Sequence, residues 1–263
     1  MNTAIRATDL AEATCAAVVM QDRIRLGMAQ LSPFGLSEDW VLKTCGDRHW
    51  TLIAQASGNE TIAFFDPEGR PLYAAFCATA LRLHAPENHG LGETLHVFSS
   101  LHAVGNCKLG SRHVFRVGAR ALGHLTMIST FLRHDDSGSN HRLTKSRLPG
   151  LRPLPQADDA LRRLDAQARL KSRQRHAAVE LTEPLVRVTP SPALDFNAVG
   201  LLYFASYTRV ADAAIPRSSA NVARDIVYFG NVDMGEEIQV FGDECDLRLV
   251  SGSGKLLASV ETR

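Results

Sequence analysis

Two segments of this chain combine a small polar residue with a glycine three positions later. Ser32 precedes Gly35 in the first segment, and Asn197 precedes Gly200 in the second. A leucine follows each glycine and begins an apolar pattern typical of a helix. The start of a helix presents unpaired backbone N–H groups and a positive dipole, and glycine lets a ligand approach them closely. The spacing therefore predicts two places where a carbonyl oxygen that gains negative charge would be stabilised.

Gly35, Leu36, Gly200 and Leu201 are the residues that we expect to contact a substrate. A thioester carbonyl held against them would be stabilised as in an oxyanion hole, where one donor commonly contributes about 3–4 kcal/mol. Asn197 could add a side-chain donor. Loss of carbon dioxide from a malonyl-type thioester leaves an enolate whose charge lies largely on that oxygen, so the pattern suits decarboxylation. No metal or organic cofactor is required for this chemistry.

Tyr73 is the candidate nucleophile for acyl transfer. It lies in the predicted strand Pro71–Leu83, where small neighbours leave room for an acyl group. A phenol ester is reactive toward a thiol because phenolate, with a pKa of about 10, leaves more readily than an alkoxide. The alternative is that Tyr73 packs at a strand edge with its hydroxyl in water. His49 is the histidine that could act as an acid, a base or an orienting group, with a structural role at a helix end as the alternative.

The composition is that of an ordinary folded protein. The 263 residues carry a formal net charge of +1, so no electrostatic footprint for nucleic acid is expected. The five cysteines form no CxxC pair, which argues against a disulfide framework and a zinc site. The apolar segment Ala11–Met20 is too short to span a bilayer. We expect a cytoplasmic protein that binds neither nucleic acid nor membranes.

The predicted elements repeat in order along the chain. Gly92–Val97 is similar to Gly235–Val240, and the two segments hold matching places in the two halves. The first half contains a helix over 37–56, interrupted near Gly46, then strands at 61–65, 71–83, 94–104, 113–119 and 124–133. The second half contains a strand at 185–188, a helix over 201–214 and strands at 223–229, 236–242, 245–250 and 255–262. The repeat predicts an α+β protein in which one unit is built twice.

The two units set the expected domain boundaries. Residues 1–22 form an N-terminal extension, residues 23–134 the first unit and residues 184–263 the second unit. Residues 135–183 form a polar linker that contains a charged helix over 158–176. Leu161, Leu164 and Leu170 share one face of this helix, which we expect to be exposed to solvent.

The segment Asn197–Tyr207 resembles the helix-start motif of hotdog-fold acyl-CoA thioesterases, in which an Asp, a Gly and an aromatic residue lead into the central helix. From Gly27 onward, the chain is similar to double-hotdog biosynthetic proteins related to the bifunctional acyltransferase/decarboxylase of leinamycin-type polyketide pathways. The segments that carry this similarity are Gly27-Met28, Gly35–Trp40, Leu42-Lys43, Gly46–Trp50 and Asp195–Phe204. The resemblance implies two tandem hotdog units, each with an antiparallel sheet wrapped around a helix.

The catalytic Asp of the thioesterases is replaced in this chain. Asn197 occupies its position, and Ser32 occupies the equivalent position in the first unit. Neither residue supplies a carboxylate that could attack a thioester or activate water, so hydrolysis by that route is disfavoured. The resemblance implies an enzyme that converts methylmalonyl-CoA to a propionyl group on an acyl carrier protein in polyketide biosynthesis. In this hypothesis Tyr73 accepts the acyl group, while Asn197 and Ser32 polarise carbonyls.

Two alternatives remain for the function. A thioesterase or dehydratase acting on a CoA- or carrier-bound chain would use His49 or another residue as its base. A hotdog protein that only binds acyl chains would hold coenzyme A thioesters without turnover. The expected partners are acyl-CoA and a phosphopantetheinylated carrier protein. Hotdog units usually pair through their sheets, so the chain is expected as a monomer or a homodimer.

Overall fold

The computed structural model describes residues 17–84, 90–175, 183–217 and 219–263. Most of the predicted N-terminal extension and residues 176–182 of the predicted linker therefore lie outside the described residues. The first strand, β1 (Val18–Arg25), begins inside the range predicted as an extension.

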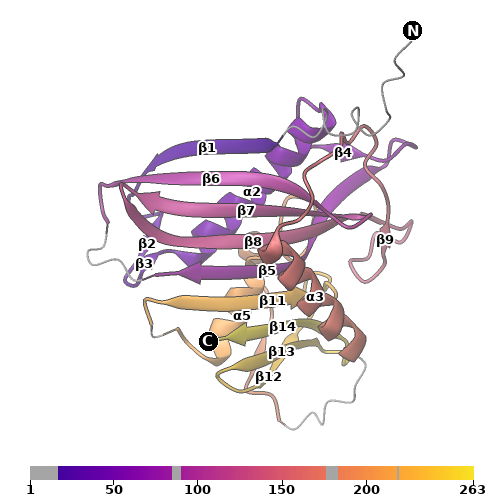
Figure 1. Cartoon of the computed structure of the whole chain (residues 1–263). Helices are drawn as coiled ribbons and strands as arrows, with labels where there is room; N and C mark the ends of the chain where they lie inside the picture. Colours follow the sequence, from indigo (N-terminus) through magenta and orange to yellow (C-terminus); the bar gives the residue numbers. More distant parts are fainter. Residues whose placement is uncertain (1–16, 85–89, 176–182, 218) are drawn as a thin grey trace.

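One large antiparallel sheet joins the two halves of the chain (Figure 1). Its main path runs β1-β6-β7-β8-β5-β11-β14-β13-β12-β10. The first half supplies β1, β5 (Pro71–Leu83), β6 (Thr94–Val104), β7 (Lys108–Val117) and β8 (Arg120–His134). The second half supplies β10 (Val186–Val188), β11 (Val222–Tyr228), β12 (Ile238–Gly242), β13 (Asp246–Ser251) and β14 (Leu256–Thr262). The strand order of one half is mirrored in the other, and the halves meet where β5 pairs with β11.

Short elements complete the fold. The small strands β2 (Leu31–Ser32) and β3 (Gly35–Leu36) pair with each other, while β4 (Phe64–Phe65) pairs with β5 and β9 (Leu143–Lys145) pairs with β8. The short helix α4 (Pro192–Asp195) precedes the second of the predicted site segments. None of the helices in the described ranges combines the length and the apolarity needed to cross a membrane.

Helices cover both faces of the sheet (Figure 1). On one face lie α2 (Glu38–Ser57), whose Leu52 packs in a buried cluster with Leu72 of β5, and α5 (Ser206–Ala214). The other face carries α3 (Asp159–Gln174), the charged helix that the sequence predicts as exposed. Leu161 and Leu164 of α3 are instead buried on the sheet, and only Leu170 is exposed. The exposed-helix prediction is wrong because the apolar stripe of α3 covers an apolar sheet face.

Helix α2 begins as the sequence predicts but is not interrupted. Ser37 is the N-cap, and its hydroxyl accepts a hydrogen bond from the Trp40 N–H. The helix continues through Gly46 to a Gly58 cap with φ 70°. A Cβ on Gly46 would lie 2.9 Å from a ring carbon of Phe204, so the glycine allows α2 to approach the second half closely.

A buried ion cluster holds the first turn of α2 against the second half. Arg224 of β11 contacts the carboxylate of Glu38 at 3.2 Å and that of Asp212 at 2.7 Å. The side chains of Arg224 and Glu38 are only 7% and 8% exposed. Burial raises the pKa of Glu38, although the charge of Arg224 opposes this shift. The pair is favourable only while both members are present, since each charge alone would be buried without a partner.

Replacing Arg224 with Met is expected to destabilise the protein by about 3–5 kcal/mol, because Glu38 would remain buried without its cation. The double variant with Met at both positions is expected to recover most of this loss, since no carboxylate is then left at position 38 without its cation. Urea unfolding of the two single variants and the double variant measures the difference. Equal losses in Arg224→Met and in the double variant would contradict the role of this pair.

Candidate functional site

The two predicted polar-glycine segments fold into similar tight hairpins. In the first, Ser32 lies opposite Gly35, and the Ser32 hydroxyl accepts a hydrogen bond of 3.2 Å from the Phe34 N–H. In the second, the Asn197 Oδ1 accepts a hydrogen bond of 3.1 Å from the Val199 N–H. Gly35 has φ 101° and Gly200 has φ 78°, values that favour glycine. The local similarity seen in the sequence is therefore a repeated turn.

Only the first hairpin leads directly into a helix. Leu201 donates its N–H to the Asn197 Oδ1 at 3.0 Å, and Leu202 forms an antiparallel bridge with Phe196. These contacts hold the segment after Gly200 extended, and α5 begins only at Ser206. The prediction of a helix start at Leu201 is thus wrong, because the carboxamide of Asn197 takes the N–H groups that a helix would have left free.

The four residues expected to contact a substrate differ in exposure. Leu36 and Leu201 are 5% and 6% exposed, Gly35 is buried and Gly200 is half-buried. Substrate contact by these residues stays a prediction. The Oδ1 of Asn197 is used within its own hairpin, whereas its Nδ2 has no hydrogen-bond partner among the described residues. The amide can thus still donate a hydrogen bond to a ligand.

Tyr73 lies near the start of β5, on the sheet face opposite α2. Its neighbours Leu72 and Ala74 pack in the α2 cluster, and side chains alternate along a strand, so the Tyr73 ring points to the other face. There the Tyr73 ring meets the ring of His134, the last residue of β8, with centroids 5.4 Å apart and planes at 72°. The sequence predicted Tyr73 but gave no reason to select His134.

Asn140 connects this pair to the second hairpin. Its Oδ1 lies 2.9 Å from the His134 Nε2, and its Nδ2 donates to the carbonyl oxygens of Gly200 and Val232, each at 2.8 Å. Tyr73 is therefore linked to the Gly200 turn through His134 and Asn140. Asn140 lies in the segment Asp135–Asn140, which the sequence marks only as a polar connector, so its role becomes visible only in three dimensions.

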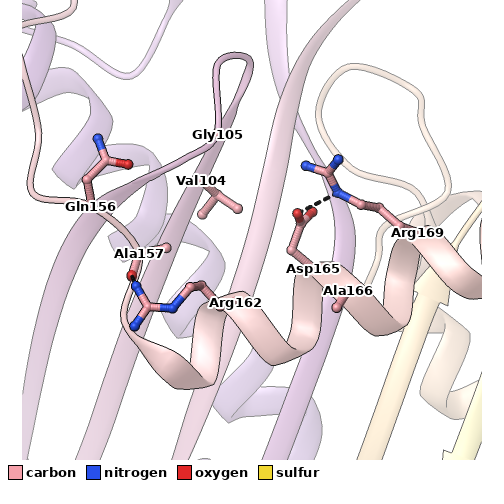
Figure 2. A pocket seen from close by; sticks show the side chains of 8 residues that line it. All are labelled: Val104, Gly105, Gln156, Ala157, Arg162, Asp165, Ala166 and Arg169. Atoms are coloured by element: carbon pink, nitrogen blue, oxygen red, sulfur yellow. Dashed lines mark hydrogen bonds and ion pairs between the residues drawn. The ribbon is translucent and has the colours of Figure 1, made fainter.

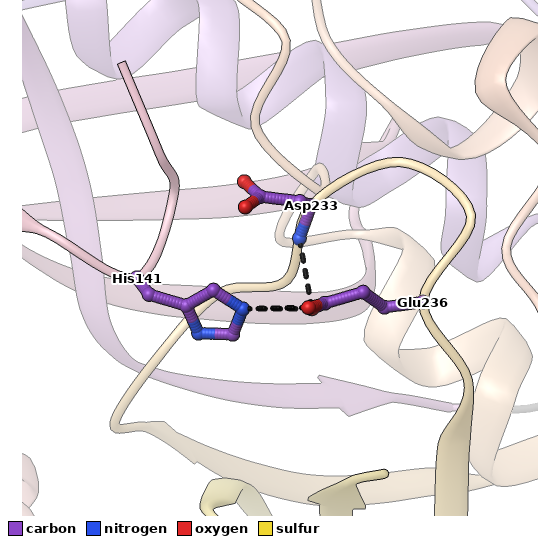
Figure 3. A group of neighbouring side chains, drawn as sticks. All are labelled: His141, Asp233 and Glu236. Carbon is purple, nitrogen blue, oxygen red and sulfur yellow. Dashed lines mark hydrogen bonds and ion pairs between the residues drawn. The ribbon is translucent and has the colours of Figure 1, made fainter. Parts of the chain in front are cut away.

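His141, Asp233 and Glu236 form a second polar group beside this link (Figure 3). Their ligand atoms all lie within 4.8 Å of one another, a grouping that could hold a cation. Each residue already has partners: the His141 Nε2 lies 2.8 Å from a Glu236 oxygen, and Asp233 accepts hydrogen bonds from Ser139 and the Asn140 N–H. These hydrogen bonds between the two halves explain why the three side chains lie together.

His49 lies in the middle of α2 and is completely buried. Its Nδ1 lies 2.8 Å from the Ser111 hydroxyl, and its Nε2 lies 2.7 Å from the Ser129 hydroxyl. Burial lowers the pKa of His49 to about 3, so the ring is neutral at neutral pH. The expected helix-end position is wrong, because α2 continues past Gly46. The catalytic role given to His49 stays a prediction, but no nitrogen of the ring is left for a substrate.

The His49 contacts belong to a longer buried chain of polar side chains. His113 lies 2.9 Å from Ser111 through its Nε2 and 2.8 Å from Ser99 through its Nδ1. Arg48 donates to the Ser99 hydroxyl at 3.1 Å. Each buried histidine thus uses both nitrogens, as expected of polar groups removed from water.

Two cavities open on the sheet face that carries α3. The first, of about 370 Å³, lies between α3 and the turn after β6 (Figure 2) and is lined by Val104, Gly105, Gln156, Ala157, Arg162, Asp165, Ala166 and Arg169. The second, of about 480 Å³, lies over β1, β6 and β7 and includes Phe98, His102 and Arg112. No residue predicted for the site lines either cavity.

Solved structures that include two acyl-ACP thioesterases share this fold. An acyl-ACP thioesterase from Bacteroides thetaiotaomicron VPI-5482 matches with a TM-score of 0.66 at 9% identity, covering 93% of this chain and 96% of that chain. The 12:0-ACP thioesterase from Umbellularia californica matches with a TM-score of 0.61 at 14% identity, covering 94% and 96%. HtdX from Mycobacterium tuberculosis matches with a TM-score of 0.55 at 11% identity, covering 93% and 99%. The predicted α+β hotdog fold is confirmed.

Sequence comparisons add no closer relative: no protein-family model and no curated protein matches the chain. The similarity to the leinamycin-type acyltransferase/decarboxylase family therefore has no support beyond the residues quoted for it. At 9–14% identity, the matching structures establish the fold alone.

Acid is expected to destabilise the protein through His49. The unfolded state binds a proton near pH 6.5, while the folded state binds it only near pH 3, so the free energy of unfolding falls as pH decreases between these values. His49→Gln is expected to reduce this dependence by up to about 1.4 kcal/mol per pH unit. Urea unfolding of both proteins between pH 7 and pH 4 measures it, and identical slopes would contradict the buried neutral state of the ring.

Proposed function

We propose that this protein is a double-hotdog enzyme that acts on acyl thioesters of coenzyme A or an acyl carrier protein. The mirrored strand order around β5 and β11, with a helix in each half, supports two tandem units. The thioesterases of similar fold support thioesters as the substrate class. The observation that carries the proposal is the phenol of Tyr73 beside the imidazole of His134, linked by Asn140 to the Gly200 turn.

Hydrolysis of the thioester is the reaction that the structural neighbours support best. Since neither hairpin supplies a carboxylate, water needs another base, and the site contains His134 and His141. A water proton would pass to an imidazole while the water oxygen bonds to the acyl carbon. The carbon–sulfur bond would then break, and the departing thiolate would take the proton.

Acyl transfer with decarboxylation is the second candidate, and the half-buried phenol of Tyr73 beside His134 favours it. The phenol oxygen would bond to the acyl carbon as the coenzyme A thiolate leaves, and a carrier thiol would then attack the phenyl ester. With a methylmalonyl thioester, the bond to the carboxylate breaks and its electron pair forms an enolate. Protonation of the enolate carbon gives the propionyl group. The Nδ2 of Asn197 could donate to the enolate oxygen.

One experiment separates these reactions. The protein is incubated with methylmalonyl-CoA, malonyl-CoA, a series of straight-chain acyl-CoA thioesters and a 3-hydroxyacyl-CoA thioester, with and without holo carrier protein. Intact masses of enzyme and carrier are followed together with the small-molecule products. Free acid indicates hydrolysis, propionyl carrier with carbon dioxide indicates transfer and decarboxylation, and a new carbon–carbon double bond indicates dehydration. Tight binding of every thioester without any product would contradict an enzymatic function.

Replacing Tyr73 with Phe tests the covalent route. If Tyr73 accepts the acyl group, the variant forms no acyl-enzyme and transfer to the carrier is lost, while direct hydrolysis by water continues. The matched control is Tyr203→Phe, which removes a phenol hydroxyl that faces Gly46 of α2 instead of His134. Intact mass after a brief incubation with substrate gives the result. A full acyl-enzyme signal in Tyr73→Phe would remove Tyr73 from the mechanism.

A further inference from the structure

The orientation of the Asn140 side chain is fixed by its partners. The residue is 6% exposed, and its Nδ2 lies 2.8 Å from two backbone carbonyl oxygens, those of Gly200 and Val232. A carbonyl oxygen only accepts hydrogen bonds, so the NH₂ group of the amide must face both of them. The reverse orientation would place the amide oxygen against two acceptors. The Oδ1 of Asn140 must therefore face His134.

This orientation also fixes the proton on the neutral His134 ring. The Oδ1 of Asn140 only accepts, and it lies 2.9 Å from the His134 Nε2. The Nε2 therefore carries the hydrogen, and the lone pair of the neutral ring is on Nδ1. That Nδ1 has no hydrogen-bond partner among the residues that the structure describes. The Nε2 of His134 therefore holds the ring in place through its hydrogen bond to Asn140, and the Nδ1 can accept a proton.

An aromatic ring and two carboxylates lie around His134. The Tyr73 ring lies against the imidazole, and two carboxylates, those of Asp135 and Asp233, interact with its charge. Hydrogen bonds from Ser137 hold the pKa of Asp135 below its ordinary value. Burial raises the pKa of Asp233, but the Asn140 N–H and the Ser139 hydroxyl outweigh it and hold the pKa low. Both carboxylates are therefore ionised at neutral pH.

We propose that His134 is the general base of the site and that Asn140 is its positioning residue. This inference rests on the proposed action on acyl thioesters. The Nδ1 of His134 takes the proton of the attacking hydroxyl, from the Tyr73 phenol in acyl transfer or from water in hydrolysis. The oxygen bonds to the acyl carbon, the carbon–sulfur bond breaks, and the proton passes from Nδ1 to the departing thiolate. No other reactant is needed for this step.

The base and its orientation come from different halves of the chain. His134 ends the first unit and Asn140 lies in the connector that follows it, but the two carbonyl groups that fix the Asn140 amide belong to Gly200 and Val232 of the second half. The Gly200 hairpin therefore acts on the reaction through Asn140 as well as through any contact with substrate. A site of this kind exists only when both halves are folded together.

His134→Gln tests the base directly. The glutamine NH₂ group can still donate to the Asn140 Oδ1, so the loop keeps its contact while the proton acceptor is lost. Turnover is expected to fall by about 100- to 10,000-fold, with KM changed much less. His96→Gln is the matched control, because His96 is a half-buried histidine of the same sheet whose ring meets only Phe98. Wild-type turnover in His134→Gln would overturn the proposal.

Asn140→Asp tests the positioning role. One carboxylate oxygen still accepts from the His134 Nε2, while the other faces the Gly200 and Val232 carbonyl oxygens that the NH₂ group had bound, so stability is expected to fall. The added negative charge is expected to move the acid limb of the pH–rate profile to higher pH. A residue with only a structural role would lower stability without moving that limb, and this result would overturn the positioning role. Asp135, Asp233, His141 and Tyr73 are the other titratable groups near the ring and are unchanged in the variant.

Nitrogen-15 NMR of the imidazole provides a readout that needs no turnover. The wild-type protein is expected to show His134 with its proton on Nε2, and a proton on Nδ1 would overturn the inference. A different result would contradict the proposed function itself. In that case the wild-type protein would convert none of the thioesters to product. If the wild-type enzyme is active and the His134→Gln variant is equally active, His134 is not the general base. The proposed action on acyl thioesters is then unaffected.

Discussion

Backbone pairing between β5 and β11 joins the two halves into one sheet, from Val222 opposite Leu83 to Val227 opposite Ala78. A slip of one residue would turn every side chain of β11 to the other face, so this register decides which groups of the halves meet. It brings the Tyr228 hydroxyl to 3.1 Å from that of Thr79 and Arg224 to Glu38. Beyond the last pair, the second half continues into the loop that Asn140 reaches. The candidate site thus depends on the same pairing as the fold.

His49 and His134 show that two histidines of one fold can have different roles. His49 is buried with both nitrogens bound to serine hydroxyls, and it has no capacity left for chemistry. His134 is half-buried; Asn140 holds one of its nitrogens, and the other has no hydrogen-bond partner in the part of the chain that the structure describes. A histidine that serves stability satisfies all its hydrogen bonds, whereas one suited to proton transfer keeps a directed lone pair available. By this criterion His134 at the end of β8 is a better candidate base than His49 inside α2.

Much of the fold followed from local patterns. The strands predicted at 71–83 and 94–104 are β5 and β6 as the structure has them, and the similar segments near Gly92 and Gly235 lead into the equivalent strands β6 and β12. Alternation of apolar residues and turn chemistry suffice for such elements. Predictions failed where one side-chain contact overrode the local pattern. Phe204 explains the uninterrupted passage of α2 through Gly46, and the Asn197 carboxamide explains the late start of α5.

The sequence by itself determined the α+β class and selected Tyr73 and Asn197 as candidates, because these rest on residue types and short-range spacing. Only the tertiary structure decided that His134 and Asn140 lie between them and that His49 is enclosed. Asn140 is separated from Gly200 and Val232 by a long stretch of chain, and no local pattern predicts which carbonyl groups a carboxamide will meet. Those partners are fixed by the packing of one half against the other, and they determine which nitrogen of a histidine is free to react.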